Sequence, residues 1–320
     1  MAPTTDSPAP AAVPVLQNSG LGASPTIGVA LGSGASRGLA HIGVMRALQE
    51  QGLKVSFVAG TSMGAFIGSV YAAGYLQRLE TDFLAFDWRS VAGLLDPVFP
   101  RSGLINGQKV ATFLSDYTSR RRIEDLPLKF RAVATDMLTG AEAILDSGDV
   151  TEAVRASIAV PGLLTPVRCN GRILLDGGLV NPVPVSAVRE MGADVVIGVD
   201  VSIDVIESRL ARIHETTTAP PTGAAAARLH EVLRAMNNPV ALQLDAWVNR
   251  APMPGILDIL MSAIYVMQAQ IAKANLERHP PDLLIRPSLG SIRFMDFDRA
   301  SEIIELGYQA ARRALIAWVA

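Results

Sequence analysis

The feature that most constrains the fold is a serine, Ser62, flanked by glycines at the junction of a predicted strand and a predicted helix. Residues 60–64 read Gly-Thr-Ser-Met-Gly and fit the pattern G-x-S-x-G. The apolar run 55–59 before it predicts a buried strand, and the apolar run 65–72 after it predicts a packed helix. In this context the pattern lifts a serine nucleophile onto a sharp turn, where the free amides and positive dipole end of the helix face its oxygen. This strand-turn-helix pattern therefore predicts an α/β domain with a nucleophile at the edge of its sheet.

A second glycine-rich turn lies upstream, over residues 32–38, between a short apolar strand and a helix that ends at Gly52. A dinucleotide phosphate turn is one interpretation. However, the spacing is G-x-G-x-x-x-G, and the next predicted strand ends at Gly60 rather than at an acidic residue. The other interpretation is an oxyanion hole, because amides of the 33–35 turn would face a developing negative charge at the edge that carries Ser62.

Three aspartates end predicted strands and compete for the role of general base: Asp136, Asp176 and Asp200. A carboxylate at the carboxyl end of a strand opens onto the ligand-binding edge of a parallel sheet. An unperturbed aspartate is a weak base, so this role requires desolvation that raises its pKa. A turn aspartate that only bonds its own backbone is the alternative. The residues alone rank the three nearly equally.

The histidines argue against a Ser-His-Asp triad. Ser62, Asp176 and His279 follow the chain order of an α/β-hydrolase triad. His279, however, precedes Pro280-Pro281 and a predicted strand, so it lies at a helix-to-strand junction, at the edge opposite the strand carboxyl ends. The remaining histidines lie in no catalytic motif: His41, which we interpret as a packing residue, His214 and His230. This favours a Ser-Asp dyad.

Together, these motifs resemble the patatin-like phospholipase family, especially its small bacterial members. The resemblance covers residues 25–205 well and the C-terminal third more loosely, and it includes residues 132–136, 158–162 and 181–184. It implies a three-layer α/β/α fold, with a mostly parallel sheet covered by helices on both faces. It also implies an acyl hydrolase in which a dyad acts on lipid esters, with a serine nucleophile and an aspartate base. No metal or cofactor is expected.

The resemblance assigns a role to each motif. The nucleophile is Ser62 and the general base is Asp176, supported by the motif glycines Gly60, Gly64, Gly177 and Gly178. The oxyanion loop comprises Gly32, Ser33, Gly34, Ala35, Arg37 and Gly38, with Arg37 at the family's basic position. Many members have three consecutive glycines in this loop, whereas this chain has Gly-Ser-Gly-Ala at 32–35. Which amides point inward therefore stays open.

The expected function is hydrolysis of lipid carboxylic esters, of phospholipase A or lysophospholipase type. Acyl transfer to an acceptor other than water and a non-catalytic module that binds acyl ligands are the alternatives. The expected partner is a lipid ester, with presentation at a membrane surface left open. The net charge of −2 and the lack of basic runs beyond Arg120-Arg121-Arg122 argue against nucleic acid. The oligomeric state is not predicted.

Four segments are expected along the chain. Residues 1–24 are rich in Ala, Pro, Ser and Thr and have no charged start or long apolar run, which predicts a disordered tail rather than a secretion signal. Residues 25–205 form the catalytic core, 206–228 a mobile loop, and 229–320 a C-terminal helical part with one further strand, packed on the core. The single cysteine, Cys169, excludes an intramolecular disulfide and agrees with a cytoplasmic location, with peripheral membrane association left open.

Strands and helices alternate, which predicts a parallel sheet. Strands are expected near 26–31, 55–59, 130–135, 172–175, 195–201 and 282–286, and helices near 38–51, 62–74, 107–118, 150–157, 184–191, 226–247, 255–277 and 298–318. The uncharged stretch 55–77 is long enough to span a bilayer, but the nucleophile turn divides it into a buried strand and helix. The apolar segment 255–276 predicts a core-covering helix, with an interfacial membrane helix as the alternative.

Overall fold

The computed structural model describes residues 25–98, 103–202 and 256–319. The predicted N-terminal tail, the predicted 206–228 loop and the predicted helix near 226–247 lie outside these residues, as do His214 and His230. Within the described residues, no helix combines the length and the apolar character that crossing a bilayer requires.

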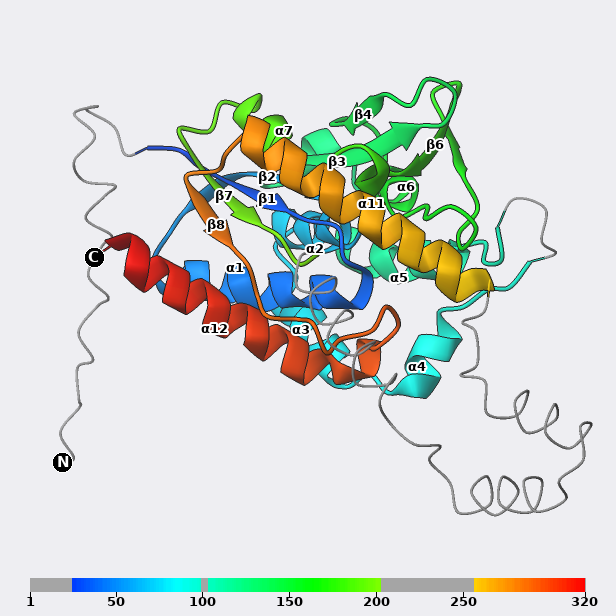
Figure 1. Ribbon diagram of the computed structural model, residues 1–320, viewed down its shortest axis with the longest axis horizontal. Helices are drawn as coiled ribbons and strands as arrows, with labels where there is room; N and C mark the ends of the chain where they lie inside the picture. The colour runs from blue at the N-terminus through cyan, green and yellow to red at the C-terminus, as the bar shows by residue number, and fades with distance from the viewer. Residues whose placement is uncertain (1–24, 99–102, 203–255, 320) are drawn as a thin grey trace, which may run out of the picture.

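An eight-stranded sheet forms the centre of the molecule, in the order β5-β6-β3-β2-β1-β7-β8, with β4 paired to β3 (Figure 1). Its strands are β1 (Ile27–Leu31), β2 (Val55–Thr61), β3 (Lys129–Asp136), β4 (Glu142–Leu145), β5 (Val167–Cys169), β6 (Arg172–Asp176), β7 (Val195–Val199) and β8 (Leu283–Ile285). The pairs that join β8, β7, β1, β2 and β3 are parallel, whereas β4, β5 and β6 pair antiparallel. The expected mostly parallel α/β sheet is confirmed.

Helices cover both faces of this sheet (Figure 1). They are α1 (Ala40–Glu50), α2 (Met63–Ala72), α3 (Leu76–Leu84), α4 (Trp88–Gly93), α5 (Gln108–Thr118), α6 (Val150–Ser157), α7 (Val185–Arg189), α11 (Ile256–Arg278) and α12 (Ala300–Val319). Short 3-10 turns include η2 (Ala35–Leu39) and η4 (Gly177–Leu179). The predicted strand and helix at 55–77 are thus β2 and α2, buried in the core rather than spanning a membrane.

Alternating side chains of the central strands build a core on each side of the sheet. Val29 and Leu31 of β1 belong to a cluster with residues of α1, α2 and α12, whereas Ala30 belongs to a cluster with residues of α7 and α11. Helix α11 buries Ala272 in that second cluster, but other apolar residues of the same helix are exposed: Ile259, Leu260 and Met267. α11 therefore covers the core with only part of its apolar surface.

Candidate active site

Ser62 occupies a strained turn between β2 and α2. Its φ of 56° lies in the region that costs a non-glycine residue about 1–3 kcal/mol. The turn is tight because a Cβ on Gly64 would lie 2.1 Å from the Leu31 carbonyl oxygen. The Ser62 amide donates to Ser157 Oγ at 2.8 Å, and Ser157 Oγ donates to the Val133 carbonyl at 2.5 Å. The turn predicted from G-x-S-x-G is therefore present, held between β1 on one side and β3 on the other.

Asp176 reaches the same level of the sheet from the far side of β3. Thr61 pairs with Val133, and the next residue of β3, Ala134, pairs with Asp176. β6 runs antiparallel to β3, so the expectation that Asp176 ends a parallel strand is wrong. The antiparallel register, rather than a shared carboxyl edge, places this aspartate opposite Ala134, one residue beyond the partner of Thr61 and so level with Ser62. A Cβ on Gly177 would lie 2.2 Å from the Val133 carbonyl oxygen, so the turn after Asp176 packs directly on β3.

The Asp176 carboxyl is fully buried next to Ser62. Burial raises its pKa from 3.8 to about 6, against the opposing effects of the Ser62 hydroxyl and the Gly178 amide. Oδ1 accepts the Gly178 amide at 2.7 Å, whereas Oδ2 accepts no hydrogen bond from the described residues within normal geometry. Burial therefore supplies the desolvation that an aspartate needs in order to act as a general base. A carboxyl with this pKa is ionised near neutral pH and can take a proton from a hydroxyl.

The two competing aspartates have other partners. Asp136 Oδ1 accepts the amides of Leu138 and Thr139 at 2.9 and 3.1 Å, and the Thr139 amide holds the pKa of Asp136 below its usual range. Asp200 Oδ1 accepts the amide and hydroxyl of Ser202, and Arg286 Nε lies 3.5 Å from Oδ2. Both carboxylates are held by their own turn or by an arginine, whereas Asp176 faces Ser62.

The glycine-rich loop follows β1 directly beside the Ser62 turn, and most of its amides are already bonded. Gly32 donates to the Val199 carbonyl at 3.0 Å, Ser33 to that of Pro182 at 2.8 Å, Ser36 to that of Phe294 at 3.3 Å and Arg37 to that of Gly34 at 3.1 Å. Among residues 32–37, this leaves the amides of Gly34 and Ala35 without a protein acceptor in the described part of the chain. Ala35 adopts a positive φ of 48° and lines the same pocket as Ser62.

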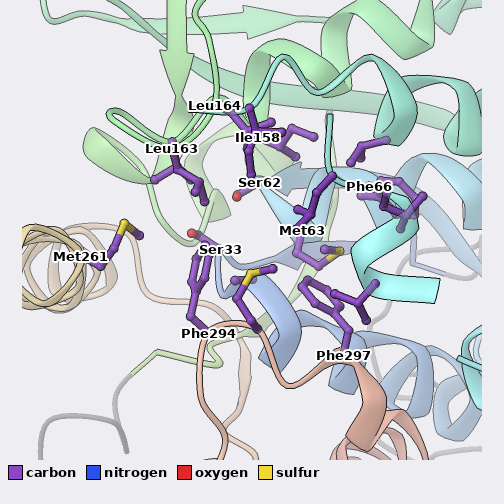
Figure 2. A pocket seen from close by; sticks show the side chains of 18 of the residues that line it. Ser33, Ser62, Met63, Phe66, Ile158, Leu163, Leu164, Met261, Phe294 and Phe297 are labelled. Atoms are coloured by element: carbon purple, nitrogen blue, oxygen red, sulfur yellow. The ribbon is translucent and has the colours of Figure 1, made fainter. Parts of the chain in front are cut away.

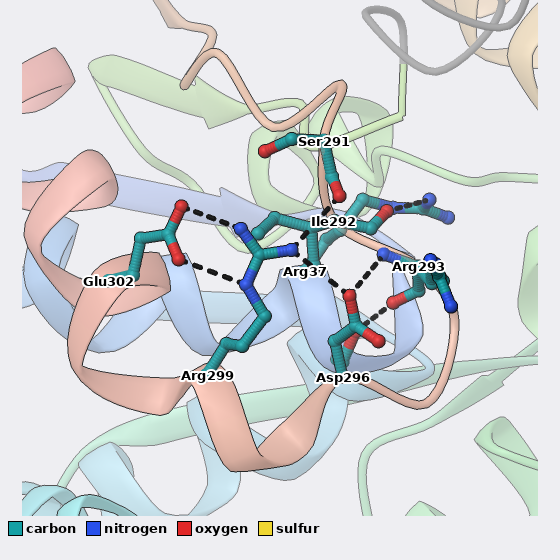
Figure 3. Close-up of polar contacts among 8 residues, drawn as sticks. Arg37, Ser291, Ile292, Arg293, Asp296, Arg299 and Glu302 are labelled. Carbon is teal, nitrogen blue, oxygen red and sulfur yellow. Dashed lines mark hydrogen bonds and ion pairs between the residues drawn. The ribbon is translucent and has the colours of Figure 1, made fainter.

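Arg37 is buried beneath the loop rather than directed at the serine. Its Nη1 donates to the Ile292 carbonyl at 3.3 Å, and its guanidinium lies 4.7 Å from the centre of the Tyr265 ring. Ser36 Oγ donates to the Arg293 carbonyl at 2.6 Å. Figure 3 shows this stretch of chain braced in turn by Arg299, which binds the Ser291 carbonyl, Asp296 and Glu302. Arg37 thus ties the oxyanion loop to a segment more than two hundred residues away.

Ser62 opens into an apolar cavity of about 140 Å³. Figure 2 shows Met63, Phe66 and Phe297 on one side of the Ser62 hydroxyl, with Leu163 and Met261 on the other. Aromatic rings of α2, α3 and α5 also line the cavity, and the Phe113 ring centre lies 6.1 Å from that of Phe66 and 5.9 Å from that of Phe83. A concave site lined mostly by apolar and aromatic side chains accepts apolar parts of a ligand. The site can therefore hold a hydrocarbon chain beside the serine.

The histidines take no part in this arrangement. His41 Nε2 lies 2.7 Å from the Gly32 carbonyl, and burial lowers the His41 pKa to about 4, so a neutral ring donates to the loop. His279 lies between α11 and β8, and β8 is parallel to β7. This places His279 at the edge opposite Ser62, as the sequence predicts. No group of three or more His, Cys, Asp or Glu side chains in the described ranges is arranged to hold a metal ion.

Three residues of the site carry no motif that would have revealed them: Ser157, Gln268 and Phe294. Ser157 ends α6, Gln268 lies within α11, and Phe294 lies in the loop before α12. Each acts through a contact with a residue more than ninety positions away in the chain. The only sequence signal close to one of them is the 158–162 segment, which follows Ser157.

The sequence of this chain is similar to those of known proteins. The family model of patatin-like phospholipases matches residues 29–189. An uncharacterized NTE family protein of Mycobacterium tuberculosis is 33% identical, and the match covers 97% of this chain and 96% of that one. The human patatin-like phospholipase domain-containing protein 6 is 29% identical over 92% of this chain but only 20% of its own length.

The structure of VipD from Legionella pneumophila has a TM-score of 0.47 and 13% identity, over 92% of this chain and 67% of that one. The family model spans half of the chain, and the mycobacterial relative matches almost all of it. On this basis, the chain belongs to the patatin-like phospholipase family.

Proposed function

We propose that this protein is a lipid acyl hydrolase that cleaves carboxylic esters through a Ser62–Asp176 dyad. Membership of a family of lipid hydrolases supports the general reaction. The observation that carries the dyad is the buried Asp176 carboxyl, whose raised pKa leaves it a base near neutral pH, facing a strained serine at the wall of an apolar cavity.

In the first half of the reaction, Asp176 accepts the Ser62 hydroxyl proton as Ser62 Oγ attacks the ester carbonyl carbon. The negative charge that develops on the carbonyl oxygen is stabilised by the amides of Gly34 and Ala35, which lack a protein acceptor among the described residues. The bond to the alcohol oxygen then breaks, and Asp176 returns the proton to that oxygen. The products are an acyl-enzyme on Ser62 and the free alcohol.

In the second half, Asp176 takes a proton from water, and the resulting hydroxide oxygen attacks the acyl carbonyl. The same loop amides stabilise the new oxyanion, and Ser62 leaves with the proton that Asp176 held. The acyl chain occupies the aromatic side of the cavity, next to Phe66 and Phe297. Each mole of ester therefore yields one mole of alcohol and one of fatty acid, with no other reactant than water.

The test combines hydrolysis of a fatty acyl ester with labelling by a serine-directed fluorophosphonate. Ser62→Ala should keep the fold and lose labelling and several orders of magnitude in rate, because the nucleophile is gone. Ser69→Ala is the matched control, since Ser69 is buried on α2 and, within the described ranges, its hydroxyl donates only to the Phe66 carbonyl. Hydrolysis by Ser62→Ala at the wild-type rate would refute the proposal.

The same assay separates the alternatives. A chain that is not labelled at Ser62 and does not turn over would be a non-catalytic module that binds acyl ligands. Labelling and ester cleavage without release of free fatty acid would indicate acyl transfer to another acceptor.

A further inference from the structure

The cavity beside Ser62 contains very few polar side chains. Of the side chains that line it in the described part of the chain, four carry a hydroxyl or an amide: Ser33, Ser62, Tyr265 and Gln268. Ser62 has its role as the nucleophile, and the Tyr265 ring stacks under the Arg37 guanidinium. Ser33 is the residue at which this loop departs from consecutive glycines. The functions of Ser33 and Gln268 are therefore open.

These two side chains form a loosely bonded pair. Ser33 Oγ donates to Gln268 Oε1 at 3.2 Å, longer than the usual O–H···O distance of about 2.7–2.8 Å. Both residues are only 5% exposed. The pair is not needed to attach α11 to the core, because Asn275 of α11 already donates a hydrogen bond to the Val180 carbonyl at 3.0 Å. The pair is a polar group within an apolar wall, with hydrogen-bonding capacity that a ligand can use.

The pair lies on one side of the nucleophile. Figure 2 shows the Ser33 and Ser62 hydroxyls directed into the same space, with Phe66 and Phe297 on one side of them and Met261 of α11 on the other. An acyl chain among the aromatic rings places the ester carbonyl at Ser62. The alcohol half of the ester then extends toward Ser33 and α11.

We propose that Ser33 and Gln268 form a polar subsite for the alcohol half, which selects esters whose alcohol carries a free hydroxyl near the scissile bond. This inference rests on the proposed hydrolysis at Ser62. A polyol hydroxyl can donate to Gln268 Oε1 and accept from Ser33 Oγ, inserting into their long hydrogen bond. An alcohol without that hydroxyl puts a hydrocarbon group against both polar atoms, which a buried polar site discriminates against.

The experiment compares two esters of the same fatty acid, 1-octanoylglycerol and propyl octanoate, which differ only in the hydroxyls on the alcohol. The wild-type chain should favour the glycerol ester in kcat/KM by about tenfold or more, and Ser33→Ala and Gln268→Leu should each reduce that ratio to about threefold or less. Two controls should keep the wild-type ratio: Ser69→Ala, a buried serine outside the cavity, and Gln270→Leu, an exposed glutamine of the same helix.

The outcomes separate this inference from the reaction on which it rests. Equal hydrolysis of both esters by the wild type, or an unchanged ratio in both variants, would overturn the subsite and leave the dyad intact. Absence of both turnover and Ser62 labelling would instead overturn the dyad. Binding of each ester to Ser62→Ala, with and without Ser33→Ala, is measured by calorimetry in parallel. Equal affinities for the two esters would overturn the subsite whether or not turnover is found.

Discussion

The two glycine-rich turns of this chain lie side by side at the end of neighbouring strands, yet they are held in different ways. The Ser62 turn is closed mainly by its own helix: the Ser62 carbonyl accepts the Ala65 and Phe66 amides at 2.9 and 3.1 Å. One remote hydrogen bond, from the Ser62 amide to Ser157 Oγ, adds to this local closure. The 32–38 loop is held by acceptors at Pro182, Val199 and Phe294. A local motif therefore gives the first turn most of its shape, whereas the second depends mainly on carbonyls from segments far away in the chain.

This difference divides the chemistry as well. In the proposed reaction, the turn with the local motif presents the nucleophile, Ser62. The loop that depends on remote contacts presents the amides of Gly34 and Ala35, whose availability follows from where the neighbouring amides bond. Substitutions should therefore act differently at the two turns: those at Ser62 and its base remove the reaction, and those around the loop weaken it while the nucleophile stays in place.

The largest effect is expected from Asp176→Asn. The asparagine keeps the shape of the turn but cannot accept a proton, so turnover should fall by several orders of magnitude. Asp136→Asn and Asp200→Asn are the controls, and folded samples of either should retain fluorophosphonate labelling at Ser62. Hydrolysis and labelling are measured for all three variants, with circular dichroism to establish folding. Turnover by folded Asp176→Asn at the wild-type rate would contradict the dyad.

If Asp176 is the base of the proposed reaction, its pKa also sets the pH dependence of the wild type. Because the base must be ionised, kcat/KM should rise with pH and level off above about pH 6. Stability should change in the opposite sense. The pKa of Asp176 in the folded chain lies above its unfolded value of 3.8. The protonated carboxyl therefore contributes its full stabilisation below pH 3.8, and this contribution is lost as the pH rises through about 6. The loss is at most about 3 kcal/mol, at about 1.36 kcal/mol per pKa unit.

Asp176→Asn lacks this ionisation and should become more stable than the wild type as the pH rises. Urea unfolding of both proteins across the acid range measures the difference. Parallel stability curves would show that the Asp176 carboxyl is not desolvated in the folded chain.

The next largest effect is expected at Gly64. A methyl group there would meet the Leu31 carbonyl oxygen at 2.1 Å and the Gly32 carbonyl oxygen at 2.7 Å, so Gly64→Ala must displace the backbone on which both turns rest. We expect a loss of about 3 kcal/mol or more in the free energy of unfolding, together with loss of labelling. Gly93→Ala is the control, because a Cβ there meets nothing within 4 Å. A stable, fully labelled Gly64→Ala protein would show that the turn is not held as tightly as described.

Most of the strands and helices could be predicted from the sequence, because the patterns that indicate them are local. Residues 55–72 contain a strand, a turn and a helix in one uninterrupted stretch, and β1, β2, β3 and β7 follow from apolar runs. Helix α3 was also readable, since Leu76, Leu79 and Phe83 recur at helical spacing and are buried, but it was not predicted. β4 and β5 span four and three residues, too few to give a periodic signal.

The features that could not be predicted from the sequence depend on contacts between segments that are distant in the chain. The antiparallel direction of β6 cannot be read from its five residues, yet it determines why Asp176 faces Ser62. The choice between Asp136, Asp176 and Asp200 depends on which carboxylate is bonded by its own turn or by an arginine. The choice between loop amides depends on carbonyls at Pro182, Val199 and Phe294.

A moderate effect is expected at Arg37, which connects the loop to the segment before α12. Arg37→Met keeps the aliphatic stem but loses the bond to the Ile292 carbonyl and the contact with Tyr265. We expect kcat to fall about tenfold with little change in KM, because the oxyanion is stabilised mainly in the transition state. Arg46→Met is a matched control, since Arg46 also stacks on a tyrosine, Tyr308, at 4.5 Å but lies away from the loop. An equal loss of kcat in both variants would mean that Arg37 acts only through stability.

The smallest effect is expected from His279→Ala. His279 follows the last turn of α11 and precedes β8, so the sheet separates its side chain from the edge that carries Ser62. Labelling, kcat and the acid limb of the pH profile should all match the wild type within error, because no step of the proposed reaction uses an imidazole. The comparison requires full pH profiles of the variant and the wild type. Loss of turnover in a folded His279→Ala protein would restore a histidine triad and remove Asp176 from the role of base.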